Sequence, residues 1–288
     1  MQSSNPVFRR AEGFNGRSTN AYGNQTYPAS GMTYPAYGES SGHGTGAPQA
    51  PAYVDQGRMT IDSVVQKTGI TLGVIVLAAA ATWFLTGDVA DPQVASMLYT
   101  LSLVGALGGF ALAMVNSFKR VISPALVIAY AALEGVFVGA FSKVVQAMFE
   151  GPGTYGLVIG AVTGTVAAFA GTLAAYKFFD IKVGDKFRKW VVAAMFGFVA
   201  VSLLDLVLHF FGSSFGFNGF GTMGLISSFI GLGIGVLMLI LDFDFVERGI
   251  AAGLPEHESW RAAFGLAVTI VWIYIELLRI LAILRGND

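Results

Sequence analysis

Apolar residues dominate the chain from about residue 69 onward, in long stretches that are separated by short polar turns. Seven of these stretches are long enough to cross the ~30 Å hydrocarbon layer of a bilayer, for which about 20 helical residues suffice. They cover approximately residues 69–86, 94–116, 124–148, 155–177, 190–211, 222–242 and 262–284. The pattern predicts an all-α membrane protein, built as a bundle of seven transmembrane helices in a lipid bilayer.

The residues before the first stretch have a different character. Gly, Ser, Pro, Ala, Tyr and Asn dominate residues 1–58, where no apolar run could offset the entropy lost on ordering the backbone. We therefore expect a disordered cytoplasmic tail at 1–58, able to contact membrane-protein partners, and a transmembrane domain at 59–288. At the start of that domain, the polar segment MTIDSVVQKT predicts a short leading helix with Thr60 as its N-cap.

The composition of the chain narrows the chemistry it can perform. The chain is 54% hydrophobic and only 12% charged, whereas ordinary soluble domains contain about 25% charged residues. It has no cysteine, and its three histidines are too scattered for a histidine-built metal site. The absence of a His-Glu-x-x-His motif and of a Gly-x-Gly-Asp stretch argues against a zinc or aspartyl intramembrane protease. We expect neither an enzyme nor a bound cofactor, and no nucleic-acid partner.

Glycines recur at four-residue spacing inside several stretches, as in Gly105 with Gly109 and Gly231 with Gly235. This spacing lets two helix backbones approach each other closely in a membrane. A phosphate-binding loop would instead need a following lysine and a soluble fold, and the sequence has neither. We therefore expect these glycines to serve helix packing.

Basic residues gather in every second connection between the stretches. These connections contain Lys119, Arg120, Lys177, Lys182, Lys186, Arg188, Lys189, Arg248 and Arg261. The other connections, TGDVADPQ, EGPGTY and GSSFGFNGFG, contain no Lys or Arg. Because basic loops stay on the cytoplasmic side, the pattern predicts a multi-pass protein of the plasma membrane with a cytoplasmic N-terminus.

Charged residues inside the stretches are the candidate functional residues, because each costs about 2.5 to 3.5 kcal/mol at mid-membrane and is usually retained for pairing or transport. They are Glu134, Asp205, Asp242, Glu276 and Arg279. Glu276 and Arg279 are spaced i, i+3 and can pair on one helix face, and this pairing competes with a functional role. Glu134 has no basic partner in its own helix, so it must face the bundle interior or a water path, or be protonated.

Three further polar residues, His209, Asp244 and Lys143, lie in or next to these stretches. His209 follows Asp205 by four residues, which favours a local ion pair or hydrogen bond over a proton relay. Asp242 and Asp244 are two residues apart, so on a helix their side chains point about 200° from each other. We expect Asp242 to face the bundle and Asp244 to lie at the wet cytoplasmic edge. Lys143 lies close to a helix end and is expected to snorkel toward the headgroups.

The segment SPALVIAYAALEGVFVGAFS, residues 123–142, carries a family resemblance. It is similar to the SPA-L-x-Y-x-x-x-EG-x-x-LG-x-x-S stretch of the Bax inhibitor-1-like family, also called the transmembrane Bax inhibitor motif or LifeGuard family. The seven stretches, the MTIDSVVQKT lead, an Asp at the end of the sixth stretch and the LLRILAIL close also fit, over about residues 59–285. The opening SSNPVFRR and the ending WIYIELLRILAILRGND resemble the actinobacterial branch of this bacterial and eukaryotic family.

The resemblance implies a pH-sensitive calcium leak channel or a membrane regulator of stress and cell-death signalling. In bacterial relatives the gate is described as two aspartates that share a proton, one ending the sixth helix and one in the seventh. Asp242 matches the first position, while the second falls at or near Thr269. Glu276, the only carboxylate of residues 262–284, lies almost two turns further on, about 10 Å away along the helix. Either Glu276 takes over the role with a changed geometry, or the dyad is absent.

The chemistry of the interior fits a hard cation. Ca²⁺ prefers carboxylate and carbonyl oxygens, and weak contacts at Asp242 and Glu134 would suit a transported ion better than a tightly bound one. We expect Ca²⁺ and H⁺ as the ions handled by the protein, with Arg279 and Glu276 beside their path. Two alternatives stay open, namely a non-conducting regulator of a membrane protease or other complex, and a cation/proton exchanger.

Overall fold

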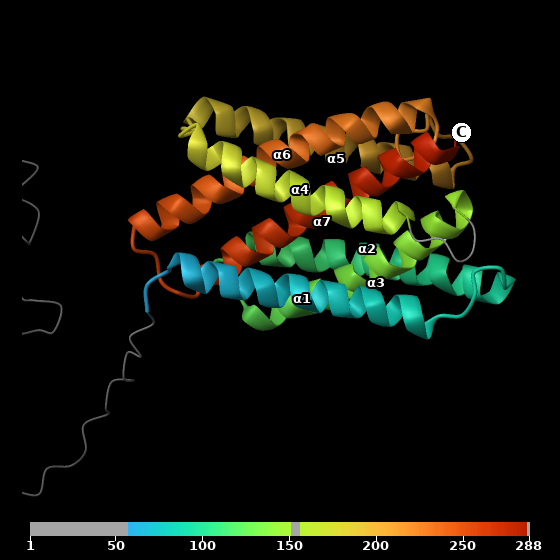
Figure 1. The fold of residues 1–288 in the computed structure, drawn as a ribbon, viewed down its shortest axis with the longest axis horizontal. Coiled ribbons are helices and arrows are strands. Elements are labelled where there is room, and N and C mark those ends of the chain that lie inside the picture. Colours follow the sequence, from blue (N-terminus) through green and yellow to red (C-terminus); the bar gives the residue numbers. More distant parts are fainter. Residues whose placement is uncertain (1–56, 151–155, 287–288) are drawn as a thin grey trace, which may run out of the picture. The chain divides into compact units, whose positions relative to one another are not determined.

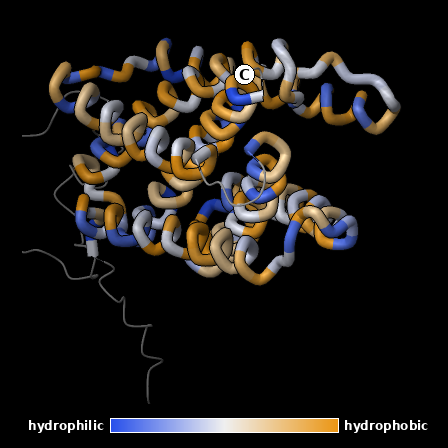
Figure 2. The backbone as a smooth tube through the Cα atoms, turned by 45° about the vertical axis from the view of Figure 1, so that its right-hand side comes forward, coloured by the Kyte–Doolittle hydropathy of each residue, from blue (hydrophilic) through white to orange (hydrophobic). Residues whose placement is uncertain are grey.

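The computed structural model describes residues 57–150 and 156–286. The tail expected at 1–58 lies outside these residues, apart from its last two positions. The helices of the described part are α1 (Ile61–Leu85), α2 (Pro92–Phe118), α3 (Pro124–Phe149), α4 (Gly156–Phe178), α5 (Asp185–Phe210), α6 (Thr222–Ala251) and α7 (Glu258–Gly286). All seven are long and apolar enough to cross a membrane, which confirms the predicted fold class. In Figure 2, hydrophobic residues dominate along the helices.

The leading segment is part of the first helix instead of a separate one. Thr60 is the N-cap as predicted, since its Oγ1 accepts a hydrogen bond of 3.1 Å from the Ser63 backbone. The Ser63 hydroxyl accepts in return from the Thr60 backbone at 3.0 Å, which completes a capping box. Two of the free donors at this helix end are thereby satisfied, and α1 continues without a break into its apolar part.

The helices are arranged around α7. In Figure 1, α7 runs between a group made of α1, α2 and α3 and a group made of α4, α5 and α6. It packs on α1, α3, α4 and α6, whereas α5 packs on α6. As a result α7 is the most buried of the seven helices, with 67% of its spanning window inside the bundle. Polar groups in the middle of α7, such as Thr269 and Glu276, therefore lie in the protein interior.

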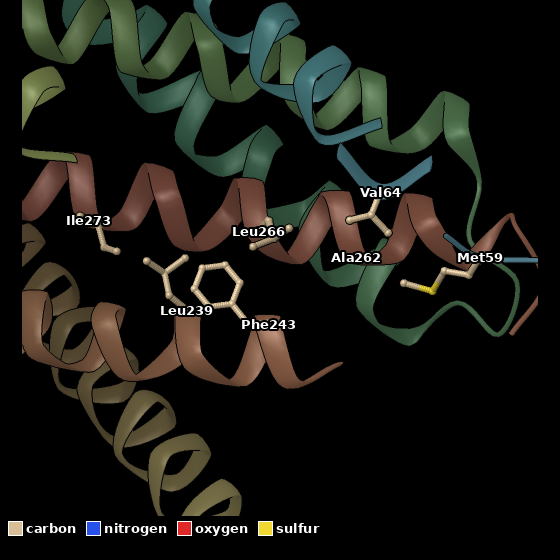
Figure 3. Packing of buried hydrophobic residues seen from close by; sticks show 7 residues of the cluster. All are labelled: Met59, Val64, Leu239, Phe243, Ala262, Leu266 and Ile273. Carbon is tan, nitrogen blue, oxygen red and sulfur yellow. The ribbon is translucent and has the colours of Figure 1, made fainter. Parts of the chain in front are cut away.

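The apolar core between α6 and α7 extends to Met59, just before α1. Figure 3 shows Leu239 and Phe243 of α6 close to Leu266 of α7, with Ile273 of α7 next to Leu239. Met59, at 2% exposure, extends the same cluster beyond the first turn of α1. This packing fixes the register of α6 against α7, and hence the side chains that lie between them.

Gly105 and Gly235 allow close helix packing, as predicted. A Cβ atom at Gly105 of α2 would lie 2.8 Å from the backbone nitrogen of Phe137 in α3. At Gly235 of α6 a Cβ atom would lie 2.7 Å from the Ile273 side chain of α7. Only glycine permits such close contact, since real Cβ atoms do not approach other atoms so closely.

Hydrogen bonds join the basic connections at one end of the bundle. The backbone of Met59 donates to Leu254 at 2.8 Å, and the Arg261 side chain donates to the Arg120 carbonyl at 2.8 Å. Arg248 donates to the carbonyl of Val183 in the α4–α5 connection. The start of α1 and the α2–α3, α4–α5 and α6–α7 connections therefore meet at this end, which we call the basic end.

Candidate functional site

The side chain of Asp242 lies between α6 and α7 and contacts Thr269. Thr269 Oγ1 donates a hydrogen bond of 2.7 Å to Asp242 Oδ2. The other oxygen, Oδ1, lies beside Gly265, where an added Cβ atom would be only 3.4 Å away. Gly265 and Thr269 are one turn apart on α7, so the carboxylate occupies the space left by a missing side chain. The position matched to the second aspartate of the family thus holds a hydroxyl group that contacts the first.

Asp244 points to a different neighbour than Asp242, in agreement with the helical geometry. Its carboxylate accepts from Arg188 of α5 at 2.7 Å and from Arg248 of α6 at 2.9 Å. The expectation that Asp244 lies at a wet edge of the protein was wrong, however, because this residue is only 5% exposed. Two guanidinium groups offset the cost of removing this carboxylate from water. In addition, α6 continues to Ala251, so Asp242 does not end the helix.

Glu276 pairs with Arg279, as the i, i+3 spacing indicates. Arg279 Nη1 lies 3.1 Å from Glu276 Oε2, and both side chains are 7% exposed. Glu276 faces Gly231 of α6, where a Cβ atom would lie 2.6 Å from its Oε1. Gly231 precedes Asp242 by about three turns, or ~16 Å along α6. Of the two alternatives, the structure favours the absence of a carboxylate dyad, because Thr269 and not Glu276 contacts Asp242.

Arg279 also holds the connection between α5 and α6. Its Nη2 donates to the carbonyl of Phe217 at 2.8 Å and to that of Gly219 at 3.2 Å. The connection therefore folds back over the end of α7 that is opposite the basic end. Through these bonds the buried Glu276–Arg279 pair is coupled to the backbone of this loop.

Glu134 lies on α3 and faces α2. A Cβ atom at Gly109 would approach Glu134 Oε2 to 2.7 Å, so the glycine makes room for the carboxylate. Among the residues that the structure describes, neither Glu134 nor Asp242 forms an ion pair. These two carboxylates lie at different helix interfaces, Glu134 between α2 and α3 and Asp242 between α6 and α7.

The local contact expected between Asp205 and His209 is not found, because Asp205 has other partners. Its Oδ1 accepts from the backbone of Phe215 at 3.0 Å and its Oδ2 from the backbone of Asn218 at 2.9 Å, while His209 is exposed. Backbone N–H groups of a loop that folds onto a membrane helix need acceptors that water cannot supply. Asp205 supplies them, so its role is to order the α5–α6 loop.

Two lysines have roles that the sequence did not reveal. Lys143, which was expected to extend toward the headgroups, caps the end of α1, donating to the Trp83 carbonyl at 2.8 Å and to the Thr86 carbonyl at 2.7 Å. Lys67 of α1 donates to the Glu256 carboxylate at 2.8 Å in the α6–α7 connection. The hydrogen bond from Lys67 and its charge lower the pKa of the Glu256 carboxyl below its ordinary value. These pairs join distant parts of the chain, so no local spacing could signal them.

The described residues do not form a preassembled metal site. Within residues 57–150 and 156–286, no group of three or more His, Cys, Asp or Glu side chains could hold a metal ion.

A family model described as Bax inhibitor 1 like matches residues 5–286 of the chain. No curated protein matches the chain.

Proposed function

Because the chain belongs to the Bax inhibitor 1 like family, we propose that it is a calcium leak pathway whose conductance responds to protonation of Asp242. The observation that carries this proposal is the environment of Asp242. It is a carboxylate between two membrane-spanning helices, and it contacts a hydroxyl group in place of a basic residue. Among the other candidate carboxylates, Asp205, Asp244 and Glu276 are held by backbone amides or by arginine.

The hydroxyl of Thr269 suits both protonation states of Asp242. It donates to the ionised carboxylate, and it can accept from the protonated carboxyl, because a hydroxyl group is both donor and acceptor. Proton binding changes the charge between α6 and α7 by one unit without loss of the hydrogen bond. A change of charge in a low-dielectric interface alters the relative free energies of two helix arrangements, and this shifts their populations.

The proposed conduction relies on weak oxygen contacts. An ionised Asp242 would attract Ca²⁺, which prefers carboxylate and carbonyl oxygens. Glu134 is the second proposed contact, since it too is a carboxylate without an ion-pair partner among the described residues. A single carboxylate at each point holds the ion loosely, and an ion must leave each point as readily as it enters. The Glu276–Arg279 pair would be a fixed part of the wall rather than a contact for the ion.

The orientation in the bilayer is part of the proposal. The basic end contains the connections rich in Lys and Arg, so we place it in the cytoplasm together with the N-terminus, in a plasma membrane. Because the chain has no native cysteine, Gly184→Cys gives a single thiol at this end. A membrane-impermeant thiol reagent added to intact cells should leave it unlabelled, and labelling would reverse the orientation.

Calcium flux into liposomes tests the function. The full chain is reconstituted alone, and Ca²⁺ entry is followed at several pH values with protein-free liposomes as the blank. We expect downhill flux that depends on pH, and a flat pH profile for Asp242→Asn, which keeps the shape but removes the titration. Asp62→Asn, which removes an exposed carboxylate in the first turn of α1, is the matched control and should behave as wild type.

The flux measurements distinguish the calcium leak from the two alternative functions. Absence of flux at every pH would favour a non-conducting regulator of a membrane complex. Flux that requires an opposing pH gradient would favour a cation/proton exchanger. An unaltered pH profile in Asp242→Asn would show that another group senses the proton.

A further inference from the structure

A groove with a volume of about 730 Å³ runs along the bundle between α1 and α4. The two helices lie on either side of α7, and the floor is formed by α3 and α7 (Figure 1). The walls contain Val76 and Ala80 of α1 and Val162 and Val166 of α4. Val76 is 64% exposed and Val166 is 63% exposed although both line the groove, so it is open along its side.

The hydroxyl groups of the lining residues Ser142, Thr165 and Tyr274 are hydrogen-bonded within the protein. The hydroxyls of Ser142 and Tyr274 lie 2.7 Å apart and form a hydrogen bond with each other. Thr165 Oγ1 donates to the Ala161 carbonyl at 2.7 Å. The groove therefore offers its occupant an almost wholly apolar surface. Such a surface selects hydrocarbon over a polar ligand, because a buried polar group would lack a partner.

The groove has the length of one bilayer leaflet. Its lining on α1 extends from Leu72 to Phe84, about 18 Å of helix, compared with ~15 Å for half of a ~30 Å hydrocarbon layer. It ends at Trp83 and Phe84 beside the C-terminus of α1, and tryptophan is common at the level of the headgroups. A transmembrane helix, with its diameter of about 10–12 Å and its need for the full bilayer thickness, does not match this half-length groove.

We propose that the groove is a binding site for one acyl chain of a membrane phospholipid, from the leaflet at the C-terminal end of α1. The groove opens toward the bilayer, and an empty apolar groove would forfeit the van der Waals contacts of its lining atoms. The second chain of the same lipid stays in the bilayer. This site is separate from Asp242 and does not depend on the proposed calcium leak.

Photolabelling of the native protein tests where the chain binds. The full chain is reconstituted in vesicles that contain a small fraction of phosphatidylcholine with a diazirine in the middle of one acyl chain. After irradiation, we expect peptides covering residues 72–84 and 158–166 to be labelled well above the exposed faces of α2 and α5. Equal labelling of all lipid-facing helices would overturn the proposal.

Titration with phospholipid tests how tightly the chain binds. Delipidated protein in mild detergent is titrated with dioleoyl phosphatidylcholine, and the lipids retained are counted by native mass spectrometry. Wild type should retain a first lipid at a concentration at least tenfold below that of further lipids. Val76→Trp, which fills the groove, should remove this step, whereas Leu77→Trp should keep it, because Leu77 is 72% exposed and does not line the groove.

A third variant controls for the possibility that Val76→Trp misfolds. If Val76→Trp melts well below wild type, Val162→Trp fills the same groove from the opposite wall. Retention of the first lipid by a folded groove-filling variant would overturn the proposal. So would equal affinity for dihexanoyl phosphatidylcholine, because recognition would then rest on the headgroup.

Discussion

Thr269 donates a hydrogen bond of 2.7 Å to Asp242 across the interface of α6 and α7. The contact occurs where the family resemblance predicts two aspartates that share a proton. Two carboxylates at this distance would titrate as a coupled pair, whereas one carboxylate beside a hydroxyl titrates as a single group. If Asp242 takes up a proton as proposed above, it therefore does so as a single group.

Thr269→Asp should convert this site into a coupled pair. We expect the pH profile of calcium flux to broaden from one step to two, separated by at least about 1 pH unit. Infrared absorbance of protonated carboxyl groups, measured across pH, checks the same change without reliance on flux. Thr269→Asn is the control, because it has the size of aspartate but cannot ionise. If Thr269→Asp and Thr269→Asn titrate alike, the two side chains do not share a proton.

Asp244→Asn should act on stability and not on the pH response. The substitution leaves Arg188 and Arg248 beside a neutral amide. Loss of one partner from a buried ion pair costs about 3–5 kcal/mol, but these arginine side chains are 44% and 51% exposed. We therefore expect a smaller loss of unfolding free energy, about 1–3 kcal/mol.

Thermal melting in detergent measures this loss. Asp180→Asn is the control, since its carboxylate is 85% exposed and pairs with a lysine that is 86% exposed. Its melting temperature should match that of wild type. A pH-independent flux in Asp244→Asn would contradict the division of roles between the two aspartates of α6.

Glu256→Gln should lower stability at neutral pH and have little effect in acid. Lys67 lowers the pKa of Glu256 in the folded protein, so the pair stabilises the fold above the ordinary carboxyl pKa of about 4.3. This contribution is lost as the pH falls through the lowered pKa. The difference in melting temperature between wild type and Glu256→Gln should therefore be largest near neutral pH and disappear at the acid end. A difference that is the same at both ends would show that the carboxylate charge is not involved.

The spans could be predicted from the sequence because a helix that crosses hydrocarbon needs an unbroken apolar run. The true end of α6 could not, because the charged residues that begin at Asp242 interrupt the apolar run without ending the helix. The α-helix continues through polar residues to Ala251, and the chain turns at Gly253, which has a φ of +66°.

The candidate site was only partly predictable for a related reason. Local spacing identified the Glu276–Arg279 pair and the divergence of Asp242 from Asp244, since both follow from helix periodicity. The burial of Asp244 depends on Arg188, which lies 56 residues earlier in the chain. Such contacts arise from the packing of helices that are distant in sequence, so no local motif predicts them.

Arg279→Lys should loosen the loop between α5 and α6 while the charge on α7 is kept. Arg279 bonds to Glu276 and to the carbonyls of Phe217 and Gly219 at the same time. A lysine at this position can neutralise Glu276, but its single ammonium group lacks the planar fork that reaches both carbonyls.

The Phe217 carbonyl keeps the Ser227 hydroxyl as a donor, whereas the Gly219 carbonyl is left without one. An inward-facing carbonyl without a donor costs about 1–3 kcal/mol, so amide hydrogen exchange across residues 215–219 should accelerate by about tenfold to a hundredfold. Hydrogen–deuterium exchange with mass spectrometry measures this change. Arg285→Lys, at the end of the same helix and 55% exposed at its side chain, is the control and should leave the loop unchanged. Exchange as slow as in wild type would mean that Asp205, through its bonds to Phe215 and Asn218, orders the loop without Arg279.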